Sequence, residues 1–131
     1  MKIRFLVIII ISVFSSVQNL AAQHDTKYLR IANIVVDSLH LESYKQAVKE
    51  HAETAVKEEA GVLMLYAVYE QLRPSHVTVF EIYASKEAYQ IHIKTPHFLK
   101  YKTTVQHMVK SLELIDANAI SLSSKNGFAN F

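Results

Sequence analysis

The chain has 131 residues, a formal net charge of +2 and no cysteine. A charge this small makes nucleic acid an unexpected partner, and the lack of cysteine excludes disulfides, thiol catalysis and thiolate metal ligands. The length suits one domain built around one hydrophobic core.

Residues 1–22 have the features of a secretory signal peptide. Lys2 and Arg4 precede an apolar run that gives way to polar residues soon after Phe14, and a pair of alanines closes the segment. A membrane-spanning helix needs ~20 apolar residues, so a retained anchor is the less favoured alternative. We therefore expect an exported protein, periplasmic or secreted, with no stable membrane insertion once the signal is removed. Loss of the two basic residues leaves equal numbers of basic and acidic ones.

The rest of the chain alternates between strand and helix patterns. The expected elements are a strand over 28–38, an amphipathic helix over 41–59, strands over 62–70 and 76–84, a short helix from 86, a helix from 96 to about 110 and a strand over 112–122. Gly61 favours a left-handed residue after the first helix, and Ser85 and Thr95 are expected N-caps. This order predicts an α+β ferredoxin-like sandwich over residues 23–118, with helices on one face of an antiparallel sheet. Residues 119–131 form a C-terminal extension that could lengthen the last strand or cap a partner subunit.

The segment 62–69 is apolar or aromatic at both alternating sets of positions. A strand with one face in water should instead alternate with polar residues. The helices can cover only one face of the sheet, so the other face needs a second cover. A second copy of the chain would supply it, which predicts a two-fold homodimer.

Two histidines fall on faces expected to be buried. His51 lies within the apolar stripe of the first long helix, and His92 points from the short helix toward the core. His97 lies on the flank of the next helix. Each could be a hydrogen-bonded core residue, but two inward histidines from different helices above one sheet favour a pocket. Without a clear third ligand they make a poor transition-metal site, so no metal is expected.

Glu81 is out of place on an otherwise apolar strand face that it shares with Val79 and Tyr83. Burying an unpaired carboxylate costs several kcal/mol, so Glu81 must have a partner or reach a cavity. Tyr66 and Tyr83 could line the same cavity from the sheet, although a row of tyrosines is more often packing than chemistry.

The segments 58–66, 80–85 and 87–101 carry a family resemblance, and His92-Ile-Lys-Thr-Pro-His97 is their most diagnostic element. On these residues the chain resembles the antibiotic biosynthesis monooxygenase domain family, especially its quinol monooxygenase and autoinducer-2-degrading branches. The resemblance spans about residues 28–116. It implies a dimeric ferredoxin-like α/β barrel, with a small apolar cavity in each subunit. It also implies oxygen chemistry on electron-rich aromatic substrates without flavin, metal or nicotinamide.

A cofactor-free oxygenase needs a base, because a phenolic anion gives electrons to O₂ far more easily than the neutral phenol. Histidine suits that role. We assign catalytic roles to His92 as principal base, His51 as its partner and Glu81 as an orienting group. Substrate contacts are assigned to Tyr66, Tyr83, His97, Phe98 and Tyr101.

Two features of the chain differ from the family pattern and exclude some of the family's activities from what we expect. The chain has no tryptophan, which the haem-degrading members use, so haem degradation is not expected. The signal peptide argues against the phosphorylated substrate of the autoinducer-degrading branch. A cofactor-independent monooxygenase acting on a quinol-like or polyphenolic molecule is the first hypothesis. A non-catalytic binder of small ligands and an isomerase that uses histidine proton transfer are the alternatives.

Overall fold

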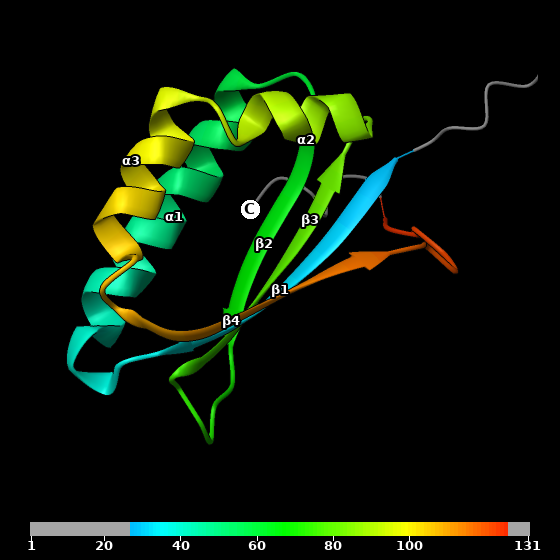
Figure 1. Cartoon of the computed structure of the whole chain (residues 1–131). Coiled ribbons are helices and arrows are strands. Elements are labelled where there is room, and N and C mark those ends of the chain that lie inside the picture. The colour runs from blue at the N-terminus through cyan, green and yellow to red at the C-terminus, as the bar shows by residue number, and fades with distance from the viewer. Residues whose placement is uncertain (1–26, 126–131) are drawn as a thin grey trace, which may run out of the picture.

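The computed structural model describes residues 27–125, so the expected signal peptide and the end of the C-terminal extension lie outside the described residues. Figure 1 shows the elements in chain order. They are β1 (Tyr28–Val36), the short 3₁₀ helix η1 (Ser38–His40), α1 (Leu41–Glu58), β2 (Val62–Tyr69), β3 (His76–Tyr83), α2 (Lys86–His92), α3 (Pro96–Val105) and β4 (Val109–Ala117).

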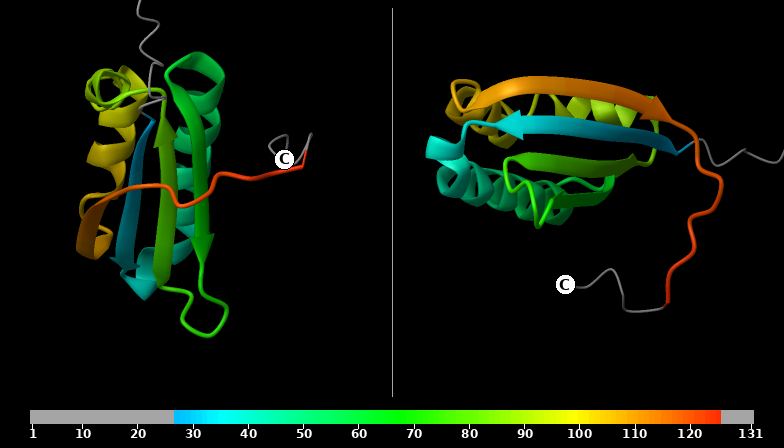
Figure 2. Two further views of the ribbon diagram at one scale, coloured as in Figure 1. Left: turned by 90° about the vertical axis from the view of Figure 1, so that its right-hand side faces the viewer. Right: turned by 90° about the horizontal axis from the view of Figure 1, so that it is seen from below.

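The four strands form one antiparallel sheet in the order β2-β3-β1-β4, and the helices cover one of its faces (Figures 1 and 2). This is the predicted ferredoxin-like α+β sandwich. The sheet of one chain stays open and does not close into a barrel on itself. In the inner strand β1, Arg30 stands opposite Glu81 of β3 and Asp116 of β4, which places charged residues side by side across three strands.

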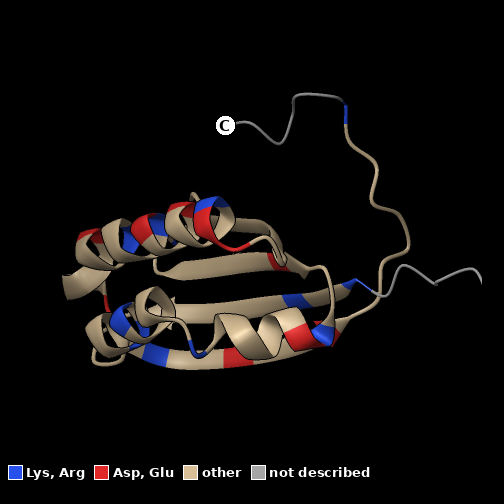
Figure 3. Cartoon of the chain, turned by 90° about the horizontal axis from the view of Figure 1, so that it is seen from above, with Lys and Arg blue, Asp and Glu red and all other residues tan. Residues whose placement is uncertain are grey.

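The core lies between α1, α3 and the sheet. Tyr44, Val48 and Ala55 are buried on the face of α1 that the sequence predicted. Tyr44 and Val48 pack with strand residues such as Ile34 in one cluster, and Ala55 packs with Leu65 in a second. Basic and acidic residues are interleaved along the helices (Figure 3). No helix between residues 27 and 125 has the length and hydrophobicity needed to span a bilayer.

The boundary between α3 and β4 comes earlier than expected, at residues 105–109 instead of about 110. The amide of Met108 donates to the carbonyl of Val105 at 2.8 Å, which turns the chain out of the helix. The amide of Asp37 then donates to the carbonyl of Met108 at 2.8 Å and brings Val109 beside the end of β1. Val105 and Met108 are both buried, and their spacing of three residues is also that of one face of a helix. The sequence pattern therefore predicts a helix where the chain in fact turns. β4 ends at Ala117, and described residues 118–125 add no strand.

Gly61 does not take the left-handed conformation expected after α1. A Cβ at this position would lie 2.7 Å from the Cβ of Ala88, closer than side-chain carbons can approach. Glycine is needed here because the turn between α1 and β2 packs directly against α2. The close contact holds the end of α1 beside α2, which matters for the site described below.

The face of the sheet away from the helices is largely apolar. Directly paired residues cross all four strands on this face as a row, which we call the open-face row: Tyr66, Phe80, Ile31 and Ile115. Tyr66 is 37% exposed and Phe80 41% exposed, although both are large and aromatic. Apolar residues are thus present on both faces of the sheet, as the sequence of β2 indicated.

Candidate active site

A cavity of about 130 Å³ lies between the sheet and the helices. Its size is close to the roughly 150 Å³ engineered cavity that accommodates benzene, so one aromatic ring is a reasonable guest. Among the predicted site residues, those on the cavity wall are His51, Glu81, Tyr83, His92, Phe98 and Tyr101. Arg30 also lines it, and apolar side chains such as Val79 and Leu114 complete much of the wall.

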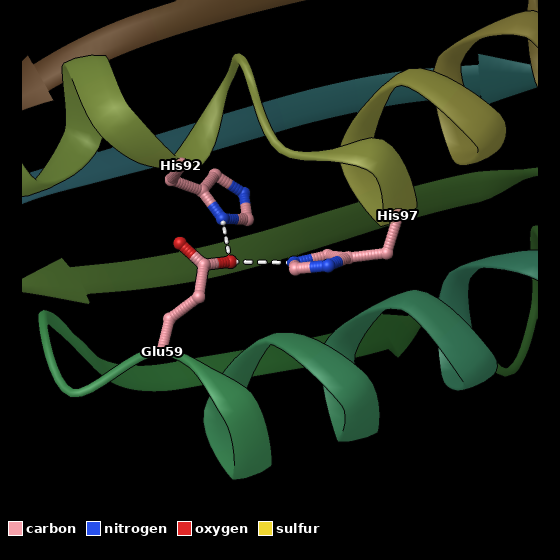
Figure 4. Close-up of side chains that lie close together, drawn as sticks. All are labelled: Glu59, His92 and His97. Carbon is pink, nitrogen blue, oxygen red and sulfur yellow. Dashed lines mark hydrogen bonds and ion pairs between the residues drawn. The ribbon is translucent and has the colours of Figure 1, made fainter.

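Glu59, His92 and His97 meet where three helix ends come together (Figure 4), and His92 also lines the cavity. Glu59 is the residue that closes α1, His92 is the last residue of α2 and His97 is the second residue of α3. Thr95 fixes the junction between α2 and α3, because its hydroxyl donates to the carbonyl of His92 at 2.7 Å and accepts from the amide of Phe98. This arrangement follows from the Thr-Pro helix start that the sequence predicted.

One carboxylate oxygen joins the two histidines. Glu59 Oε1 lies 2.7 Å from His92 Nδ1 and 2.5 Å from His97 Nε2. The His92 side chain is 2% exposed, and those of Glu59 and His97 are 12% and 16% exposed. Charge-assisted hydrogen bonds of this kind are short and strong, so the three side chains hold one another in place.

The shared oxygen sets the protonation pattern of His92. An ionised carboxylate only accepts hydrogen bonds, so a neutral His92 that bonds it carries its proton on Nδ1. Its Nε2 then holds the free lone pair and, within residues 27–125, makes no hydrogen bond. Glu59 therefore orients His92 as a base, in the way a carboxylate orients the histidine of a hydrolase triad. His92 itself is on the wall of the cavity.

Glu59, His92 and His97 are also a possible metal-binding set, because their ligand atoms all lie within 4.8 Å of one another. Two histidines and one carboxylate are a known ligand combination for divalent transition metals. The sequence expectation concerned the inward pair His51 and His92, and His51 does not belong to this set. However, two ligands at 2.0–2.1 Å from one tetrahedral ion are separated by roughly 3.3 Å. The observed separations of 2.7 and 2.5 Å instead match direct hydrogen bonds.

His51 sits in a different environment from His92. Its ring stacks on that of Tyr101, with centroids 4.6 Å apart and planes 10° apart. Burial, followed by the proximity of His92 and His97, lowers the pKa of His51 to about 3. Its buried Nδ1 has no hydrogen-bond partner among the described residues. His51 is thus neutral at physiological pH and suits hydrogen bonding to a guest better than proton abstraction.

Glu81 has the partner that the sequence required. The hydroxyl of Tyr83 donates to Glu81 Oε2 at 2.8 Å, and Arg30 stands opposite Glu81 on β1. Burial raises the pKa of Glu81, while the Tyr83 hydrogen bond and Arg30 oppose that rise. Burial also raises the pKa of Tyr83. This end of the cavity therefore has a carboxyl group with an increased tendency to stay protonated, next to a hydroxyl that does not ionise.

Two predicted substrate contacts lie elsewhere. Tyr66 belongs to the open-face row, on the opposite side of the sheet from the cavity. An irregularity in the pairing between Val62 and Met64 reverses the alternation of β2, so Leu65, and not Tyr66, faces the helices. His97 bonds Glu59 and is not on the cavity wall.

Glu59 and Arg30 were not identified from the sequence. Glu59 is one of two consecutive glutamates at the end of α1, where helical periodicity no longer assigns a direction. Arg30 could have been found, because it is the one charged residue in the apolar strand Tyr28–Val36.

Comparison with known proteins agrees with the fold, a ferredoxin-like α+β domain. The family model for antibiotic biosynthesis monooxygenases matches residues 27–104. A solved structure from Bacteroides thetaiotaomicron, assigned in name to the same family, is 47% identical with a TM-score of 0.75, and the match covers 76% of this chain and 97% of that one. The chain belongs to the antibiotic biosynthesis monooxygenase family.

More distant structures share the architecture. A protein from Lactobacillus acidophilus, named as a monooxygenase, is 31% identical with a TM-score of 0.67, over 69% of this chain and 43% of that one. A protein from Nitrosomonas europaea is 18% identical with a TM-score of 0.70, over 76% of this chain and 96% of that one, and shows the likeness of fold alone. A search of curated proteins found no match.

Proposed function

We propose that the protein is a cofactor-independent monooxygenase that oxidises a quinol-like or polyphenolic small molecule with O₂. The observation that carries this proposal is the hydrogen bond from His92 Nδ1 to Glu59, at 2.7 Å, on the wall of an aromatic-sized cavity. It leaves His92 Nε2 as the base. Membership of a monooxygenase family supports the same chemistry.

In this mechanism His92 Nε2 takes the proton of a phenolic hydroxyl, and Glu59 stabilises the imidazolium that forms. The phenolate then transfers electrons to O₂. One oxygen atom bonds to a ring carbon that loses its hydrogen, and the other leaves as water with the two hydrogens that the substrate gave up. The products are a quinone and water, so the substrate supplies all the electrons.

The remaining cavity residues position the guest. His51, being neutral, and Tyr101 are able to hydrogen-bond a substrate oxygen, and Phe98 contacts the ring of His51 edge-on. Tyr83 and Glu81 provide a second polar group at the sheet side of the cavity. The apolar walls limit the number of water molecules that can hydrogen-bond to the phenolate oxygen.

We also propose that the protein acts as an exported homodimer, periplasmic or secreted. The open-face row would be covered by the same row of a second copy, in keeping with the half-exposed aromatic side chains there. The signal-like N-terminus supports export.

The test is oxygen consumption by the purified protein with a panel of hydroquinones, comparing wild type with His92→Ala. His107→Ala is the matched control, because His107 is exposed and is not part of the cavity wall. We expect consumption above the spontaneous rate in wild type and in His107→Ala, and its loss in His92→Ala while circular dichroism shows a folded protein. Wild-type protein that binds the hydroquinones without consuming oxygen would instead support the binding or isomerase alternatives.

A further inference from the structure

Arg30 has an unusual position for a positive charge. It is 9% exposed, lies in β1, one of the two inner strands, and lines the cavity. Its guanidinium carbon lies 4.5 Å from the centroid of the Tyr89 ring, which holds the flat group in place by a cation–π contact. A buried charge of this kind normally has a partner that accepts its hydrogen bonds.

Within residues 27–125, no side chain fully satisfies the hydrogen-bond donors of Arg30. Nε of Arg30 is buried and has no hydrogen-bond acceptor. The nearest carboxylate atom is Asp116 Oδ1, at 3.3 Å, and this atom already accepts a hydrogen bond from the hydroxyl of Tyr28. The Asp116 side chain is 63% exposed, so water screens its charge.

The carboxyl group of Glu81 neutralises the positive charge of Arg30 only in part. It stands opposite Arg30 in the sheet, but one of its oxygens is taken by Tyr83, and burial raises its pKa toward the neutral form. No ion pair within 4.0 Å joins Glu81 to Arg30. The guanidinium therefore has donors left over at the wall of a cavity that is otherwise largely apolar.

We propose that Arg30 binds an acidic group of the substrate, and that the cavity takes an aromatic acid, a phenol that carries a carboxylate on its ring. A guanidinium is suited to a carboxylate because its N–H groups form a planar fork that matches two oxygens. This inference names the substrate class of the monooxygenase proposed above and rests on it for turnover. The binding step, however, is independent of oxygen chemistry.

The order of the wall residues supports the proposal. Tyr83 contacts both His92, at 5.4 Å between ring centroids, and Tyr89, at 5.3 Å. Tyr89 in turn carries Arg30, so the rings of Tyr83 and Tyr89 link the base to the cation along the cavity wall. Because Arg30 and His92 both line the cavity, a ring bound in it can direct its hydroxyl toward His92 and its carboxylate toward Arg30.

The test compares two probes of the same shape, 4-hydroxybenzoate and 4-hydroxybenzamide, by isothermal titration calorimetry. They differ mainly in charge, so their ratio of dissociation constants isolates recognition of the carboxylate. We expect wild type to bind the acid at least about tenfold more tightly. Arg30→Gln is expected to remove this preference while the amide binds as before, which also shows that the variant cavity is intact. Lys86→Gln, at an exposed position near the same end of the sheet, is the matched control and keeps the preference.

Asp116→Asn provides a second variant that leaves Arg30 in place. Removing the competing carboxylate is expected to tighten binding of the acid and leave the amide unchanged. Equal binding of both probes to wild type, no binding of either, or a preference that survives in Arg30→Gln would overturn the proposal. A failure of the monooxygenase proposal would appear differently, as acid binding without oxygen consumption.

Discussion

The low pKa of His51 makes a quantitative prediction about stability. His51 has a pKa of about 3 in the folded protein because it is buried and lies beside His92 and His97. In the unfolded chain a histidine titrates near ~6.5. Between these two values the unfolded state binds a proton that the folded state does not. The stability from this group is therefore fully present above pH ~6.5 and is lost as pH falls toward 3.

The size of the loss follows from the unfolded value. At pH 5 the solution is about 1.5 pH units below the unfolded-state pKa of histidine, and each pH unit corresponds to ~1.4 kcal/mol. Protonation of His51 in the unfolded chain therefore lowers the free energy of unfolding by about 2 kcal/mol between pH 7 and pH 5. Because pH 5 is well above 3, the result changes little if the folded pKa differs by one unit. Glu81, whose pKa is raised, acts in the opposite direction as pH falls.

The measurement is urea denaturation followed by circular dichroism at pH 7 and pH 5, for wild type and His51→Gln. The variant lacks the titrating ring but keeps Glu81 and the other carboxylates, so their effects cancel in the comparison. We expect wild type to lose about 2 kcal/mol more than the variant over this interval. Equal losses in the two proteins would show that folded His51 takes up its proton as readily as the unfolded chain does, and would refute its assignment as a neutral wall residue.

Two further predictions concern Glu59 and the open face. Glu59→Gln should lower kcat at least about tenfold with little change in KM in the oxygen-consumption assay, because a neutral amide does not stabilise the His92 imidazolium. Glu58→Gln, at the exposed neighbouring position, should keep the wild-type kcat, and an equal loss in both would contradict the orienting role. Phe80→Glu should convert a dimer to a monomer in light scattering, whereas wild-type protein that is already monomeric at micromolar concentration would contradict the homodimer.

Much of the fold was predictable because its signals are local. The alternation of β3, the Ser85 and Thr95 caps and the apolar stripe of α1 each identify an element without knowledge of the rest. The start of β4 was not predictable in this way. Val105 and Met108 continue a helical period, and only hydrogen bonds to distant β1 end the helix.

The candidate site was predicted less completely, because a site is defined by contacts between elements. His51, His92 and Glu81 were located by asking which polar residues fall on buried faces, and that reasoning applies to Arg30 as well. Tyr66 was misplaced because a single irregularity in β2 reverses every later side chain of that strand. Glu59 follows the end of a helix, where its direction depends on how α1 packs against α2, through the close contact of Gly61 with Ala88.

The two inward histidines are chemically similar in the sequence but have different environments in the structure. His92 has a carboxylate partner, whereas His51 has a tyrosine ring against its face and a buried nitrogen without a partner. The carboxylate of Glu59 fixes the orientation of His92, and burial lowers the pKa of His51. Pairs of groups whose surroundings separate them in this way commonly divide the work of a reaction between base and hydrogen-bonding partner. Because burial keeps His51 uncharged, the three adjacent imidazoles never place three positive charges side by side.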